Sequence, residues 1–115
     1  MKMPRSKYGK LVPKAYGNTF DKLITVVCDV FLVSPEEIWG YRGSERAIWA
    51  RMLMYKMTYA KLQNKKEVAR MFRKHHASFV NGLVKLNWYV QQIVRLKNLC
   101  EEVGKRLNIK MFAAA

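Results

Sequence analysis

The sequence predicts an all-α fold, a compact helical bundle that contains a helix-turn-helix and an extra C-terminal helix. Apolar residues recur at helical spacing from about residue 18 to residue 107, and helix-capping sequences precede several of these segments. No other period repeats. At 115 residues, half of them hydrophobic, the chain can bury one core but is too short for two independent ones.

Composition divides the chain into three parts. Residues 1–17 form a basic arm with Lys2, Arg5, Lys7, Lys10 and Lys14, broken by prolines and glycines. A solvated terminus and a segment that orders along phosphates both remain open for this arm. Residues 18–88 hold the main helical domain, and residues 89–112 hold the C-terminal helix.

The first two helices are indicated by periodicity and by capping. From residue 18 an apolar stripe predicts an amphipathic helix, and its members are Phe20, Leu23, Ile24, Val27, Cys28 and Phe31. Ser34 then supplies an N-cap hydroxyl, Pro35 the first helical position and Glu37 the third position of a capping box. This short helix ends near Gly40, before a loop at residues 41–43.

A long third helix is expected from residue 44 or 45 to about residue 63. Its apolar stripe is made of Ile48, Met52, Tyr55, Tyr59 and Leu62, and Met52, Met54 and Met57 are interpreted as adaptable core filler. Arg46 and Arg51 fall mostly outside the stripe, so we expect them on the polar side.

Three further helices complete the bundle. Residues 64–67 repeat the capping-box pattern and open a short helix with Val68, Ala69, Met71 and Phe72. A fifth helix begins near residue 77, and Asn87 or Trp88 is expected to bend the chain before a last helix over 89–107. Two roles for that last helix remain open, packing on its own core or pairing two protomers as a homodimer.

The charge balance predicts a polyanionic partner. Twenty-two Lys and Arg oppose eight Asp and Glu, a formal charge of +14, which fits nucleic acid, an anionic membrane or an acidic protein. The sequence shows no apolar run long enough to span a membrane and no signal peptide, and Cys28 and Cys100 stand at apolar helical positions without a CxxC motif. We therefore expect a cytoplasmic protein with reduced thiols and no membrane partner.

A helix-turn-helix over about residues 65–86 narrows the choice of polyanion. Ala69 is a small residue for the helix crossing, and Phe79 follows ten positions later. The turn and the next helix start carry residue types that read base edges or bind phosphates: Arg73, Lys74, His75, His76, Ser78 and Asn81. This pattern predicts binding to double-stranded DNA.

These segments resemble the C-terminal DNA-binding domain of the bacterial replication initiator DnaA, a helix-turn-helix of the Trp-repressor type. The resemblance covers about residues 23–88, through Val-Cys-Asp-Val-Phe at 27–31, Ser-Pro-Glu-Glu-Ile at 34–38, Arg51, and Glu-Val-Ala at 67–69 with Phe72. The family signature, in outline Gly-Arg-Asp-His-Thr-Thr-Val, corresponds to Arg-Lys-His-His-Ala-Ser-Phe at 73–79. His76 matches it, whereas His75 and Ala77 depart from it.

The resemblance implies how the DNA would be read. In the family this surface reads a nine-base-pair box, and the departures here imply a diverged site or mainly phosphate-driven binding. A basic loop of the family reaches the minor groove, and Arg42 occupies that region. Arg46, Arg51 and Lys65 complete the predicted DNA-binding set.

The chain carries no Gly-rich phosphate loop, so we expect neither a nucleotide nor another cofactor. A freestanding domain of this type suggests a phage or mobile-element protein that acts in replication initiation or its regulation. The alternatives are a transcriptional regulator and a non-specific DNA-coating or virion-associated protein. An enzyme is not expected, because the eight acidic residues are scattered, and adjacent His75 and His76 lack a metal-ligating partner at suitable spacing.

Overall fold

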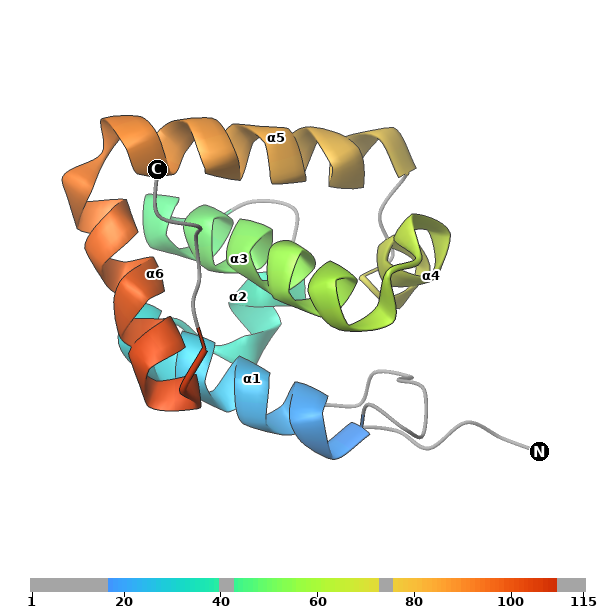
Figure 1. Cartoon of the computed structure of the whole chain (residues 1–115), viewed down its shortest axis with the longest axis horizontal. Helices are drawn as coiled ribbons and strands as arrows, with labels where there is room; N and C mark the ends of the chain where they lie inside the picture. Colours follow the sequence, from blue (N-terminus) through green and yellow to red (C-terminus); the bar gives the residue numbers. More distant parts are fainter. Residues whose placement is uncertain (1–16, 40–42, 73–75, 110–115) are drawn as a thin grey trace.

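The computed structural model describes residues 17–39, 43–72 and 76–109, and all regular structure in these ranges is helical, which confirms the predicted all-α bundle. The helices are α1 (Gly17–Phe31), α2 (Pro35–Trp39), α3 (Glu45–Leu62), α4 (Lys65–Met71), α5 (His76–Gln92) and α6 (Val94–Leu107). Figure 1 shows α1 and α5 on opposite sides of α3, with α6 running between them. The α3–α4 turn and the start of α5 lie at the other end of the molecule.

The central helix is α3, which packs against α1, α2, α4 and α5. Its residues 49–55 are all buried, because neighbouring helices cover α3 on several sides. The single predicted stripe is therefore too simple: Ile48 is 41% exposed, whereas Trp49 is 4% exposed. Met52 and Met54 are buried and Met57 packs against the core, which confirms their role as core filler.

An aromatic cluster joins the helices at the core. Phe72, the residue after α4, has its ring centroid 4.9 Å from Trp39 at the end of α2 and 5.0 Å from Tyr55 of α3. Phe20 of α1 stacks on Trp39 at 5.9 Å, and Phe79 of α5 meets Tyr55 edge-on at 5.5 Å. Such offset and edge-on ring pairs add to the stabilisation from burial. Here they connect α1, α2, α3, the end of α4 and α5.

The predicted caps fix the helix starts. The amide of Glu37 donates to Ser34 Oγ at 3.3 Å, and the amide of Ser34 donates to Glu37 Oε1 at 3.0 Å, which forms the expected reciprocal box at α2. Ser44 caps α3 by accepting from the Ala47 amide at 3.2 Å. These bonds satisfy amides that have no partner inside a helix.

The predicted bend at Asn87 or Trp88 is wrong. The fifth helix, α5, continues to Gln92. Ile93 follows in an extended conformation, with φ of −117° and ψ of 101°, and separates α5 from α6. Leu86 and Val90 keep the buried stripe of α5 in register through the predicted bend. The boundary placed between residues 88 and 89 therefore falls inside one helix.

The last helix packs on its own chain. Its buried residues Leu96, Cys100 and Val103 belong to the common core, and α6 contacts both α1 and α5. Arg106 forms an ion pair with Asp29 of α1. Cys100, Val103 and the partly buried Leu107 face this core, so this apolar side of α6 packs inside the protomer, which is one of the two roles expected for the last helix.

Candidate nucleic-acid interface

Helices α4 and α5 form a contacting pair supported by α3. Val68, Ala69 and Met71 of α4 are buried, as is Phe79 of α5, so each helix turns its apolar side inward. Only four residues separate the end of α4 at Met71 from the start of α5 at His76. Figure 1 shows α3 and α4 on the same side of the first turns of α5, so the opposite side of these turns faces away from both helices.

The outer side of α5 carries polar groups suited to base edges. Ser78 and Asn81 are exposed, and their spacing of three residues brings them to one face of the helix. Asn can donate and accept at the same time, and Ser can do either. Ala77 beside them is exposed and leaves room for a close approach.

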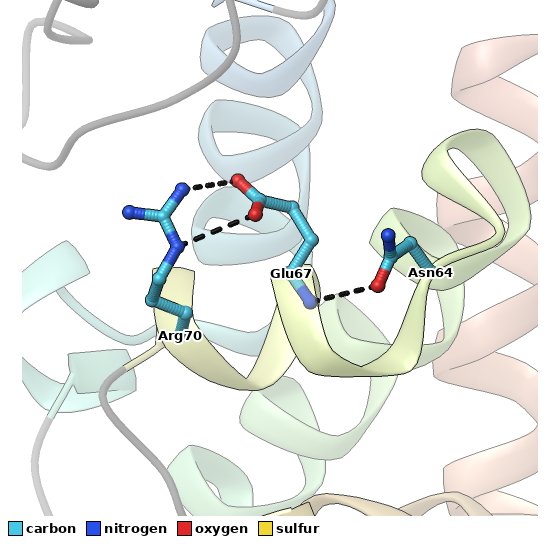
Figure 2. Close-up of polar contacts among 3 residues, drawn as sticks. All are labelled: Asn64, Glu67 and Arg70. Carbon is cyan, nitrogen blue, oxygen red and sulfur yellow. Dashed lines mark hydrogen bonds and ion pairs between the residues drawn. The ribbon is translucent and has the colours of Figure 1, made fainter.

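The start of α4 is held by its own side chains, as Figure 2 shows. Asn64 Oδ1 accepts from the amide of Glu67 at 3.0 Å, whereas the Glu67 carboxylate pairs with Arg70, whose Nε donates to Glu67 Oε2 at 3.3 Å. The predicted capping box at α4 is therefore half formed. The pairing with Glu67 raises the pKa of Arg70, so this arginine stays charged and already has a partner.

Lysines without an acidic partner surround this helix start. Lys61, Lys65 and Lys66 are exposed, and no ion pair within the described ranges involves them. Lys65 Nζ lies 5.8 Å from the centroid of the Tyr59 ring, which leaves the ammonium near the surface. We call Lys61, Lys65 and Lys66 the α4 lysine cluster.

Two members of the α4 lysine cluster were missed by the sequence prediction, which selected Lys65 alone. The available signal was local charge balance: from Lys61 to Lys85 the chain carries seven Lys and Arg residues and one acidic residue, Glu67. On α6, by contrast, Arg106 pairs with Asp29 and Glu102, and Lys97 Nζ lies 4.0 Å from Glu101 Oε1. Charges near α6 are thus partly neutralised, as is Arg70 of α4, whereas the described ion pairs leave Lys61, Lys65 and Lys66 without an acidic partner.

The prediction that Arg51 lies on the polar side of its helix is wrong. Its side chain is buried, with the residue 6% exposed, and its guanidinium donates to the carbonyl oxygens of Glu37 and Ile38 at 2.7 and 2.8 Å. Burial lowers the pKa of Arg51, and the same burial raises the pKa of the neighbouring Tyr55 to about 12. Arg51 therefore holds α2 on α3, and these two carbonyl oxygens occupy its Nε and Nη2 groups.

The remaining predicted contacts divide into described and undescribed residues. Arg46 is half-buried in the first turn of α3. Four predicted contacts lie outside the described residues: Arg42, Arg73, Lys74 and His75. The basic arm up to residue 16 lies outside them as well. His76 begins α5, but its side chain is not among those described. The structure therefore brings together Lys65, Ser78 and Asn81 at one end of the molecule.

The described residues contain no cluster of three or more His, Cys, Asp or Glu able to hold a metal ion. Cys28 and Cys100 are both free, and burial raises their pKa values to about 11 and about 12. Among the helices that the structure describes, none combines the length and apolar character of a membrane span.

Comparisons of the chain with protein-family models, curated proteins and solved structures gave no match. The likeness to the DnaA domain therefore rests on sequence segments within residues 23–88.

Proposed function

We propose that the chain is a sequence-specific double-stranded DNA-binding protein that uses α4 and α5 as a helix-turn-helix. One observation carries the proposal: Ser78 and Asn81 are exposed on one face at the start of α5, at the end of the molecule that bears the α4 lysine cluster. In this arrangement α5 enters the major groove, the polar side chains meet base edges, and the lysines meet phosphates.

The role we propose is binding rather than catalysis, without nucleotide or cofactor, in bacterial replication initiation or its control. That role follows from the resemblance of residues 23–88 to the DnaA domain, and transcriptional regulation by the same contacts is its alternative. The DNA would be that of a bacterial cytoplasm or of a phage-infected host.

A second candidate is a protein that coats DNA without reading its sequence. Exposed lysines on other helices favour it, since Lys22 on α1 and Lys105 on α6 also face solvent. Such a protein depends on total charge, whereas a sequence reader depends on a few side chains.

Selection from a pool of random-sequence duplexes, together with binding to a duplex carrying the initiator box, distinguishes the two. We expect enrichment of one short site. Asn81→Ala should weaken binding to that site about 5- to 150-fold, the range for loss of one base contact, and His76→Ala should abolish the enrichment. Asn98→Ala is the matched control, because Asn98 is an exposed asparagine on α6.

The outcomes separate the candidates. Enrichment that is lost in Asn81→Ala and retained in Asn98→Ala supports the sequence reader. Steep salt dependence without enrichment supports the coating protein, because each neutralised phosphate adds about 0.9 to the slope of log affinity against log salt. Absence of binding to any duplex rejects both.

A further inference from the structure

The C-terminal half of α5 exposes apolar side chains to solvent. Val84 is 63% exposed and Trp88 57% exposed, and their spacing of four residues places them on one face of the helix. The other exposed residues from 84 to 94 are Lys85, Asn87, Gln91 and Gln92 of α5 and Val94, the first residue of α6. We call this set, including Val84 and Trp88, the α5 ridge.

The α5 ridge is unusual for so basic a chain. One of its seven residues, Lys85, is charged. The exposed residues of α6, by contrast, include Arg95, Lys97, Glu101, Lys105 and Arg106. An exposed tryptophan among uncharged amides has the composition of an interface centre, where aromatic residues are enriched and charged residues are depleted.

Charge decides which partner fits. With a formal charge of +14, two copies of the chain repel each other wherever their lysines and arginines meet. This repulsion is small at the α5 ridge, where Lys85 is the one charged residue. An acidic partner would be recognised by a cluster of cations, and the ridge supplies Lys85 alone.

We propose that the α5 ridge is a homodimer interface, in which α5 helices of two copies pack across a two-fold axis. Val84 and Trp88 of each copy would cover those of the other, as an isologous contact requires. The amides of Asn87, Gln91 and Gln92 both donate and accept, so each can pair with the same residue types across the axis.

The ridge is distinct from the proposed DNA-reading residues on the same helix. Trp88 lies ten residues beyond Ser78, about 15 Å along the helix at 1.5 Å per residue. The inference stands without DNA. If the proposed function also holds, the dimer would present two copies of the start of α5 to two half-sites.

Sedimentation equilibrium of the full chain without DNA tests the proposal. We expect the mean mass to rise with concentration from 13.5 kDa to twice that value. Association should strengthen between about 0.15 and 0.5 M salt, because screening weakens the repulsion between copies. Val84→Lys and Trp88→Ala should each raise the dimer dissociation constant at least about tenfold, as for residues at an interface centre.

Leu32→Lys is the control, because Leu32 is an exposed apolar residue in the α1–α2 turn and gains the same charge outside the ridge. It should leave the dissociation constant within about twofold of its original value. A monomeric mass at every concentration and salt overturns the proposal, and so does equal weakening by Val84→Lys and Leu32→Lys. Thermal melting of each variant checks that the fold is intact, and Trp88→Ala adds no charge, so it separates lost packing from added repulsion.

Discussion

Arg51 of α3 is hydrogen-bonded to the last turn of α2, with Nε 2.8 Å from the Ile38 carbonyl oxygen and Nη2 2.7 Å from the Glu37 carbonyl oxygen. Carbonyls at a helix end have no partner within the helix, and they carry the negative end of its dipole. The guanidinium supplies both a positive charge and donors at that point. The two hydrogen bonds of Arg51 thus join α3 to α2, between residues that are 13 and 14 positions apart in the sequence.

Arg51→Met should lower the free energy of unfolding by about 2–3 kcal/mol, because it leaves buried carbonyls without donors while keeping most of the apolar contact. Denaturant unfolding followed by circular dichroism measures this change. Lys61→Met, at an exposed position of the same helix, should stay within about 0.5 kcal/mol of the original protein. Equal effects of the two substitutions would contradict the structural role of Arg51.

Gly82 marks the close approach of α5 to α3. A Cβ at this position would lie 3.1 Å from Tyr55 Cδ2 and 3.3 Å from Tyr55 Cε2. The Tyr55 ring is held between Phe72 and Phe79, at centroid distances of 5.0 and 5.5 Å, so it has little room to move. We expect Gly82→Ala to destabilise the protein by about 1 kcal/mol, because overpacking exceeds the gain in helix propensity.

A double-mutant cycle tests this reason for the effect. In a Tyr55→Ala background the obstructing ring is gone, so Gly82→Ala should become stabilising by about 0.5–1 kcal/mol through helix propensity alone. If Gly82→Ala destabilises both backgrounds equally, Tyr55 is not the cause.

Two buried groups, Cys100 and Tyr55, and the half-buried Cys28 predict a loss of stability at alkaline pH. Burial raises the pKa of Cys28 from 9.0 to about 11, of Cys100 from 9.0 to about 12, and of Tyr55 from 10.0 to about 12. Above pH 9 the unfolded chain releases these protons before the folded chain does, so their contribution to stability is complete below pH 9. It is lost as pH rises toward 12.

Denaturant unfolding in pH steps from 8 to 11 checks the prediction. Cys28→Ala should flatten the decline between pH 9 and 11, because the unfolded state then has one proton fewer to release. A free energy of unfolding that stays constant up to pH 11 would show that these groups titrate alike in both states.

Local signals predicted most of the fold, and long-range packing explains what they missed. Three helix starts could be predicted from capping residues: Ser34, Ser44 and Asn64. Each accepts a hydrogen bond from the amide three positions later, so both partners lie within one short stretch of sequence. The break at Ile93 has no such signal, since no side chain caps α6. It is therefore visible only in the structure.

Some residues of the candidate site could likewise be placed from the sequence, and others could not. Exposure of Ser78 and Asn81 follows from the stripe of α5, which the sequence displays. Arg51 looks in the sequence like any other basic residue on a helix. Its burial depends on α2 packing against α3, and no periodicity reports that contact.

The α4 lysine cluster provides a test of how charge acts in DNA binding. If Lys65 and Lys66 contact phosphates, Lys65→Ala and Lys66→Ala should each reduce the slope of log affinity against log salt by about 0.9, and should weaken binding to specific and random duplexes alike. Asn81→Ala should do the reverse, lowering affinity for the selected site while leaving the salt slope unchanged. Fluorescence anisotropy titrations over a salt series measure both quantities.

Lys105→Ala is the matched control for this pair of substitutions, because Lys105 is exposed in the last turn of α6 and its loss changes the net charge equally. A localised interface predicts an unchanged slope for Lys105→Ala. Equal reductions for Lys65→Ala, Lys66→Ala and Lys105→Ala would mean that phosphates are met over the whole surface, as in a coating protein. The comparison therefore depends on where a lysine lies, since each variant removes the same charge.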